Sequence, residues 1–403
     1  MTDAAIDAVT GGPIDLAATR ADTPGSHRGV FLDSAGSSLP PVQVLDEVIG
    51  HLHREAEIGG YRAADERARD LEDGYAVLAT ALGCEPDEVA FTDSATRAWL
   101  AAFDSIPLAE GDRILVTEVE YAGNAIPLLR RAAEVGATVE PVPSDAHGAV
   151  DVEALRRRID ERVQVVSLVH VPTNGGLVNP VDEVVAAAHE VGALVLLDAC
   201  QSAGQVPLTG LAADIVTGTG RKWLRGPRGT GFLVVRRDVL GRLRPRQVDL
   251  HSGTWETLDR YRLREDARVF ELWETSVADR LGLIAAFRYA LDLGIDAIAE
   301  AVRDRATHLR AGLTRIPGVT VRDLGVNQCG IVTFTVDGVA PATVRDRLRE
   351  RGVTVHTSGV ESTRYDMTRR NLDEVVRASP HYFISPAQLD AAVAAVTAVA
   401  GTR

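Results

Sequence analysis

One amine stands out among the residues of this chain that could do chemistry. The sequence has 43 lysine and arginine residues, and only Lys222 is a lysine. It lies in the stretch GTGRKWLRGPRGTGF, between two glycine-rich turns. A lysine amine can lose its proton and attack a carbonyl carbon to form a Schiff base, whereas a guanidinium group cannot. Because arginine fills every other basic position, we expect a nucleophilic nitrogen here rather than a surface charge left by chance.

Two polar residues follow an apolar run upstream of that lysine. The stretch LVLLDACQ ends in Asp198 and Gln201. An aspartate is costly to bury in such a place unless it is paired with a positive group. The protonated ring nitrogen of pyridoxal 5'-phosphate (PLP) is such a partner, and Gln201 could reach the phenolic oxygen of that cofactor. The alternative is that Asp198 caps a following helix.

A third stretch could bind a phosphate group. FTDSATRAW (91–99) is typical of a strand that runs into a helix through a turn of small residues. The N-terminus of such a helix offers backbone N–H groups to a phosphate, and Thr96 adds a hydroxyl. Thr219 could donate from the opposite side, and Arg221 could add positive charge. Together with Lys222 and Asp198, these residues indicate one cofactor site.

The elements that must position these residues alternate along the chain. The predicted strands are 88–92, 113–119, 163–171, 193–199, 213–218 and 231–237. Helical patterns such as 122–136 and 180–192 lie between them, and each ends at a glycine. Near-continuous apolar strands separated by helices predict a mostly parallel sheet covered on both faces. Ligands bind beyond the carboxyl ends of such strands, where the polar residues above lie.

The chain divides into three predicted parts. Residues 1–28 are polar and broken by glycine and proline, which indicates an N-terminal arm. Residues 29–290 contain the α/β pattern of a large cofactor-binding domain. Residues 291–403 combine helical patterns with two short strand patterns, which predicts a smaller C-terminal α+β domain.

The composition argues against several classes of function. A net charge of −14 disfavours nucleic acid or an anionic membrane as a partner. No apolar stretch approaches the roughly 20 residues of a membrane span, and no signal peptide is recognisable. The three cysteines, Cys84, Cys200 and Cys329, have no metal-binding spacing and are expected to be reduced thiols. We therefore expect a soluble cytoplasmic protein without a metal site.

From VFLDSAGSSLPP to VRASPHYFISPAQLD, the chain resembles the class V, cysteine desulfurase-like branch of PLP-dependent enzymes. GTGRKWLRGPRGTGF and REAEIGGYRAAD resemble a subgroup that contains isopenicillin N epimerase-like proteins and the ergothioneine-pathway C–S lyase. The resemblance implies the α/β fold of type I PLP-dependent transferases. It also implies a homodimer with active sites near the subunit interface.

The resemblance assigns a role to each matching residue. Lys222 would hold PLP as a Schiff base and move the Cα proton, while Asp198 would pair with the ring nitrogen. The other implied cofactor contacts are Gln201 at the phenolic oxygen, Tyr121 stacked on the ring, Thr173 beside it, and Ala95, Thr96, Thr219 and Arg221 at the phosphate. The implied substrate contacts are Arg377 at the α-carboxylate, the backbone of Ala35 and Gly36, and Tyr61 in the pocket.

Two segments depart from the family pattern. Desulfurases carry a catalytic cysteine in the loop that follows the strand written here as VTVHTSGVES, and Glu361 stands roughly at that position. Desulfuration through a persulfide is therefore not expected. Where many relatives pass a threonine to the partner's phosphate, this chain reads FELWETS (270–276). Trp273 and Glu274 there could instead shape the substrate pocket.

These features predict a PLP-dependent enzyme that acts on an α-amino acid. With a sulfur leaving group on Cβ, the outcome would be C–S β-elimination from a cysteine S-conjugate. Transamination and epimerisation use the same residues and stay open as alternatives. A non-catalytic protein of this fold is disfavoured because Lys222, Asp198 and Arg377 are all present. A nicotinamide-dependent enzyme is disfavoured because no strand is followed by a GxGxxG turn with a suitably placed acidic residue.

Overall fold

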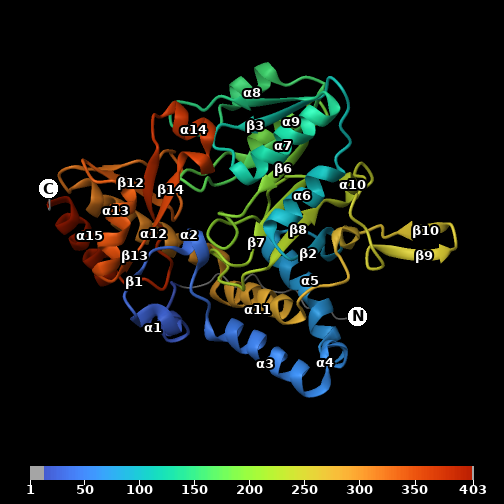
Figure 1. Ribbon diagram of the computed structural model, residues 1–403, viewed down its shortest axis with the longest axis horizontal. Coiled ribbons are helices and arrows are strands. Elements are labelled where there is room, and N and C mark those ends of the chain that lie inside the picture. Colours follow the sequence, from blue (N-terminus) through green and yellow to red (C-terminus); the bar gives the residue numbers. More distant parts are fainter. Residues whose placement is uncertain (1–12, 402–403) are drawn as a thin grey trace.

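A seven-stranded sheet forms the centre of the protein (Figure 1). The computed structural model describes residues 13–401, so the predicted arm is described only from residue 13 onward. The strands lie in the order β2-β8-β7-β6-β5-β3-β4. Their bounds are β2 (Val89–Thr92), β3 (Arg113–Thr117), β4 (Thr138–Val142), β5 (Val163–Val169), β6 (Leu194–Asp198), β7 (Ile215–Thr219) and β8 (Gly231–Val235).

The strand directions confirm the mostly parallel sheet. Only β8 runs against its neighbours β2 and β7, and the other pairs from β7 to β4 are parallel. The carboxyl ends of β2, β3, β5, β6 and β7 therefore meet at one edge. Strand β4 was not predicted from the sequence. It is an edge strand whose residues TVEPV include glutamate and proline and are partly exposed up to the buried Val142. Such a strand lacks the continuous apolar run that marks the buried ones.

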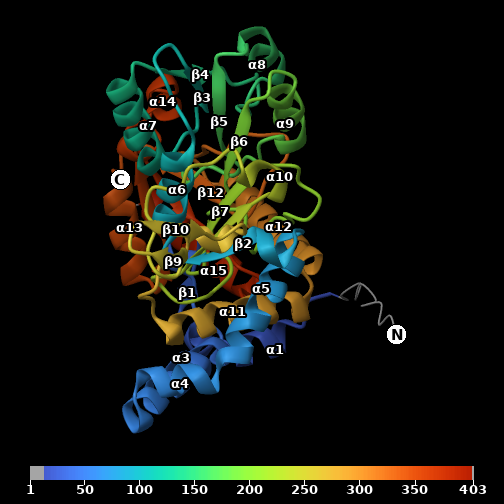
Figure 2. The ribbon, with the colours of Figure 1, turned by 90° about the vertical axis from the view of Figure 1, so that its right-hand side faces the viewer.

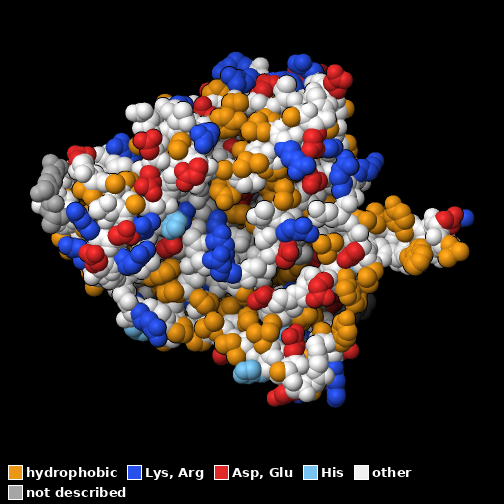
Figure 3. Space-filling view, viewed as in Figure 1, with side chains coloured by type: hydrophobic (Ala, Val, Ile, Leu, Met, Phe, Trp, Pro, Cys, Tyr) orange, Lys and Arg blue, Asp and Glu red, His pale blue; other side chains and the backbone are white. Residues whose placement is uncertain are grey.

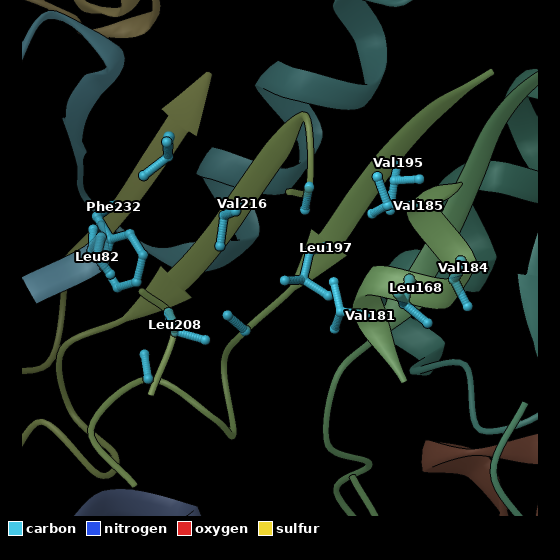
Figure 4. Close-up of a cluster of buried hydrophobic side chains, with 14 of the residues drawn as sticks. Leu82, Leu168, Val181, Val184, Val185, Val195, Leu197, Leu208, Val216 and Phe232 are labelled. Carbon is cyan, nitrogen blue, oxygen red and sulfur yellow. The ribbon is translucent and has the colours of Figure 1, made fainter. Parts of the chain in front are cut away.

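Helices cover both faces of this sheet (Figure 2). Along β6, Val195 and Leu197 point into one hydrophobic cluster, and Leu194 and Leu196 into the other. Figure 4 shows the first cluster, in which valines of α9 pack against β5 and β6. The helices of that face are α5 (Ala68–Leu82), α8 (Val152–Arg158), α9 (Val181–His189) and α11 (Val277–Leu293). The helices of the other face are α6 (Ala95–Ser105), α7 (Ala122–Val135) and α10 (Arg237–Leu240).

A four-stranded antiparallel sheet forms a second, smaller unit. Its order is β11-β12-β15-β14. Its strands are β11 (Val319–Val321), β12 (Val332–Val336), β14 (His356–Gly359) and β15 (Glu374–Ala378). The helices of its hydrophobic cluster are α12 (Ile295–Thr314), α13 (Pro341–Glu350) and α15 (Pro386–Gly401). The boundary between residues 290 and 291 stays a proposal.

The N-terminal segment packs on this second unit. Strand β1 (Val30–Phe31) pairs in parallel with β13 (Val353–Thr354). Ser379 N donates to Leu32 O at 2.7 Å, and Ala35 N donates to Ser379 Oγ at 3.0 Å. The short helix α2 (Ser34–Ser37) follows directly. Residues near both ends of the chain are thus joined beside the central sheet.

A β-hairpin projects from the molecule (Figure 1). It consists of β9 (Gly253–Thr257) and β10 (Arg260–Leu263), paired antiparallel. The other helices are α1 (Leu16–Ala21), α3 (Val42–Ile58), α4 (Gly60–Glu66) and α14 (Arg364–Arg369), with 3-10 turns η1 (Pro24–His27), η2 (Pro86–Glu88), η3 (Ala267–Phe270) and η4 (Val360–Ser362). Between residues 13 and 401, no helix combines the length and apolar character needed to span a membrane.

Leu197→Ala tests the packing of the sheet on its helices. Leu197 is fully buried in the cluster of Figure 4. Its truncation should lower the free energy of unfolding by about 2–5 kcal/mol, because it leaves a cavity. Denaturant titration of both proteins measures this loss. The control is Val326→Ala, at a side chain that is 76% exposed, where the change should stay within about 0.5 kcal/mol. Equal losses in the two variants would contradict the described core.

Candidate active site

A cavity of about 490 Å³ opens at the carboxyl edge of the central sheet. Its volume lies within the range of roughly 300–1,000 Å³ that is typical of small-molecule sites. The structure brings twelve predicted site residues together in its lining. They are Ala35, Gly36, Ala95, Thr96, Tyr121, Thr173, Asp198, Gln201, Thr219, Arg221, Lys222 and Arg377.

The structure does not bring Tyr61 to this cavity. Tyr61 lies on α4, where 81% of it is exposed, and it is absent from the lining. Helices α3 and α4 extend away from the central sheet (Figure 1). The exposure of Tyr61 shows that its ring faces solvent. Tyr61 was predicted as a pocket residue from the motif GGYRAAD, and that motif does not indicate where its helix lies.

Lys222 lies in the turn that follows β7. The backbone of Gly204, with a φ of +91°, packs closely against the backbone of this turn at Trp223. A Cβ at Gly204 would lie only 2.6 Å from the carbonyl carbon of Trp223, so only glycine fits there. Ser38 N donates to Arg221 O at 2.8 Å and fixes the turn from the other side. Burial lowers the pKa of Lys222, and the charge of Arg221 lowers it further. A lowered pKa increases the fraction of neutral amine, which is the nucleophilic form.

Asp198 is a buried carboxylate at the end of β6. It is 6% exposed and lines the cavity. Its Oδ1 accepts from Cys200 N at 2.9 Å, and its Oδ2 accepts from Asn124 Nδ2 at 2.9 Å. Within residues 13–401, no basic side chain forms an ion pair with it. The helix-cap alternative is not seen, because turns rather than a helix follow β6. A buried carboxylate without a basic partner fits a cationic ring nitrogen.

The amide of Gln201 is held on several sides at the cavity wall. Its Nε2 donates to Ala35 O at 3.1 Å and to Thr173 Oγ1 at 3.4 Å. Its Oε1 accepts from Trp223 Nε1 at 3.0 Å. Gln201 therefore links the Lys222 turn to the N-terminal segment. Its predicted contact with a phenolic oxygen remains a prediction.

The first turn of α6 forms one side of the cavity. Ser94 caps this helix, since its Oγ accepts from Arg97 N at 3.2 Å. The first N–H groups of a helix have no intrahelical acceptor, so Ala95 and Thr96 offer theirs to an anion. Across the cavity, Thr219 Oγ1 donates to Thr230 O at 3.3 Å. These positions suit the phosphate of PLP.

Arg221 is partly engaged by the protein itself. One of its nitrogens donates to Gly36 O. Burial lowers its pKa, and the nearby charge of Arg228 adds to that effect. Two cationic side chains therefore lie close together in the lining, which is favourable for an anionic ligand.

Arg377 projects from β15 into the cavity. Its Nη1 donates to Thr173 Oγ1 at 2.8 Å, and its Nη2 lies 3.3 Å from Asp33 Oδ1. Its Nε is buried and has no hydrogen-bond partner in the described chain. Burial lowers its pKa, and the Asp33 carboxylate opposes that effect. A buried guanidinium with an unpaired N–H can bind a substrate carboxylate.

Several lining residues were not predicted from the sequence. They are Asp33, Asn124, Cys200, Arg228 and His356. Asn124 and Cys200 occur in polar segments that follow predicted strands, and this position was the available signal. Burial raises the pKa of the Cys200 thiol well above its usual value, so it is a poor nucleophile in this state.

The residues that depart from the family pattern lie outside this lining. Glu361 is exposed, and its carboxylate lies against Gly359. Trp273 and Glu274 are also exposed and are absent from the lining. The possibility that they shape the substrate pocket therefore gains no support within a single chain.

The lining fits PLP on four counts. It offers an amine with a lowered pKa, a buried carboxylate without a basic partner, a capped helix N-terminus and a half-exposed aromatic ring, Tyr121. Arg377 adds a guanidinium for a substrate carboxylate. The individual roles predicted for these residues remain proposals.

Comparison with known proteins gives one consistent set of relatives. Residues 30–391 match the family model described as aminotransferase class-V. A probable cysteine desulfurase 2 of Mycobacterium leprae is 34% identical over 371 residues, which span 85% of this chain and 87% of that protein. A probable cysteine desulfurase of Methanothermobacter thermautotrophicus is 30% identical over 372 residues, which span 90% of this chain and 93% of that protein.

Solved structures share the fold. The cysteine desulfurase of Thermococcus onnurineus NA1 has a TM-score of 0.89 at 23% identity and covers 98% of this chain and 100% of its own. The cystine C–S lyase C-DES has a TM-score of 0.83 at 24% identity and covers 93% of this chain and 99% of its own. At these identities the likeness establishes the fold alone.

Gly231→Ala tests the phosphate side of the cavity. A Cβ at Gly231 would lie 2.5 Å from Ala95 N, so the added methyl must displace the first turn of α6. Loss of one hydrogen bond to a charged group costs about 1.5–3 kcal/mol, so the Kd for PLP should rise by about ten- to a hundredfold. Fluorescence titration of the apoprotein with PLP measures this change. Gly241→Ala is the control, because no atom lies within 4 Å of its added Cβ and its Kd should not change. An unchanged Kd for Gly231→Ala would contradict the assignment.

Proposed function

We propose that this chain, a PLP-dependent enzyme that belongs to the aminotransferase class-V family, cleaves the C–S bond of a cysteine S-conjugate by β-elimination. The observation that carries the proposal is a cavity lined by Lys222, Asp198 and Arg377 together. The family resemblance adds that Glu361 stands roughly at the position of the catalytic cysteine of desulfurases. We assign the chain to the subgroup of isopenicillin N epimerase-like proteins and C–S lyases on the motifs around Lys222 and Tyr61.

The chain's own residues supply the proton transfer and the orientation. Bound PLP supplies a ring that withdraws electrons from the bonds of the substrate Cα. In the proposed mechanism, Arg377 holds the α-carboxylate, and Asp198 keeps the ring nitrogen protonated. Lys222 accepts the Cα proton, because its lowered pKa makes the neutral amine available as a base.

The proposed bond changes balance without a redox partner. Removal of the Cα proton leaves an electron pair that expels the sulfur group from Cβ, so the C–S bond breaks and a thiol or sulfenate leaves. Hydrolysis of the remaining three-carbon unit gives pyruvate and ammonia. The fold is compatible with this chemistry, since C-DES is a cystine C–S lyase.

Desulfuration is the main competing proposal, because the relatives are named cysteine desulfurases. That chemistry needs a reactive thiol to accept the substrate sulfur. Cys200 lines the cavity, but burial raises the pKa of its thiol well above the usual value. Cys84 and Cys329 are not part of the lining.

Transamination and epimerisation differ from each other only in the atom or face to which the proton returns. No residue of the site favours either reaction.

We also propose a cytoplasmic homodimer with active sites near its interface. The hairpin β9–β10 supports this, because Trp255 is 76% exposed, Leu258 94% and Tyr261 69%. Figure 3 shows the apolar side chains gathered on the projection. Such exposed clusters mark interaction surfaces. The three free cysteines suit a reducing compartment.

Pyruvate release from a panel of cysteine S-conjugates and their sulfoxides tests the lyase proposal. The wild-type holoenzyme should release pyruvate and ammonia in equal amounts from at least one member. Lys222→Ala should release none and should lose the yellow colour of the bound cofactor, because it has no amine. Absence of pyruvate across the panel would refute the lyase proposal. A spectral change that a keto acid reverses would favour transamination instead.

The double variant Trp255→Ser with Tyr261→Ser tests the dimer. Light scattering should give the mass of two chains for the wild type and of one chain for the variant, because the apolar contact is lost. Val326→Ser, at another exposed apolar position, is the control and should stay dimeric. A dimeric double variant would exclude the hairpin from the interface, and a monomeric wild type would exclude the dimer.

A further inference from the structure

A second buried carboxyl lies behind Asp198. Glu120 follows β3, is 1% exposed and lies outside the cavity lining. The amide nitrogen of Asn124 is 3.0 Å from Glu120 Oε1 and 2.9 Å from Asp198 Oδ2. One amide group therefore donates to both carboxyl groups. Because both contacts are acceptors, the Asn124 amide can hold only one orientation, with its nitrogen between them.

The contacts of Glu120 suit a protonated acid. Its Oε1 also accepts from Tyr121 N at 2.9 Å, and its Oε2 lies 2.8 Å from Ser167 Oγ. A hydroxyl can accept as well as donate, so a proton on Oε2 has an acceptor in Ser167. Within residues 13–401, Glu120 forms no ion pair. Burial raises the pKa of Glu120 to about 8, and the charge of Asp198 contributes. A neutral Glu120 adds no second negative charge beside Asp198.

We propose that Glu120 is a positioning residue for Asp198. Its Oε1 fixes the Asn124 amide, and that amide in turn holds Asp198 Oδ2. The other oxygen of Asp198 is held by the backbone N–H of Cys200, so the whole carboxylate is fixed at the floor of the cavity. The inference rests on the proposed contact between Asp198 and the ring nitrogen of PLP. It does not depend on the reaction that the enzyme catalyses.

The alternative is that Glu120 only fills space between β3 and β5. The two roles make different demands on the side chain at position 120. Glutamine keeps the acceptor Oε1 and has an Nε2 that can donate to Ser167, so it imitates the protonated acid. Methionine has a similar size, but its thioether sulfur is only a weak acceptor for the Asn124 amide. If Glu120 positions Asp198, the glutamine and methionine variants should therefore differ in PLP binding. If it only fills space, they should behave alike.

The test measures PLP binding and the absorption spectrum of the bound cofactor, without substrate. Glu120→Met should raise the Kd for PLP by about tenfold and shift the absorption maximum, because Asp198 is less well held. Glu120→Gln should stay within about twofold of the wild type. Asn124→Leu, which removes the bridging amide, should reproduce Glu120→Met. Thermal melting of each apoprotein shows whether the variants fold. If Glu120→Met does not fold, Asn124→Leu serves as the test in its place.

A double-mutant cycle separates positioning from packing. In the background of Asp198→Asn, Glu120→Met should have no further effect on the Kd or on the spectrum, because the residue it acts through has changed. An undiminished effect in that background, or equal effects of glutamine and methionine, would overturn the inference. Wild-type behaviour of Glu120→Met would overturn it as well. If Asp198→Asn alone changes neither quantity, the premise about the ring nitrogen fails instead.

Discussion

A carboxylate buried without a basic partner is the constraint around which this site is built. Asp198 lies at the end of a strand whose other side chains are apolar and fully buried. Asn124 and the backbone of Cys200 stabilise it with two hydrogen bonds, and no basic side chain among residues 13–401 forms an ion pair with it. Burial of a charge at such a place costs free energy that a bound cation would offset. The lysine turn, the capped helix and Arg377 surround the same cavity.

The strands that could be predicted from the sequence are the buried ones, which appear as runs of consecutive apolar residues. LVLLD and VQVVSLV are apolar at most positions on both faces, because helices cover both sides of the sheet, and both strand predictions were confirmed. Strand β4 was missed, since an edge strand with exposed residues resembles a loop in its composition. The reversal of β8 was also beyond reach, because strand order and direction depend on pairing between distant segments.

The site residues divide in a similar way. Lys222 was found because no other lysine competes with it, and Asp198 because it interrupts an apolar run. Asn124 contacts both Glu120 and Asp198 only because β3 and β6 lie in one sheet, so these partners cannot be inferred from sequence spacing. Asp33 likewise acquires its contact with Arg377 from a pairing between segments more than 340 residues apart. Tyr61 is the opposite case: its motif predicted a pocket residue, but it lies on a helix that extends away from the central sheet and does not line the cavity.

The docking of the N-terminal segment on the second unit has a consequence for the order of folding. Asp33, Ala35 and Gly36 line the cavity, yet their segment docks through β13 and Ser379, which are synthesised more than 300 residues later. Before those residues exist, the nascent polypeptide already contains all seven strands of the central sheet, but this part of the cavity lining has nothing to dock on. Completion of the cavity therefore depends on contacts between distant segments, whose loop closure is slow.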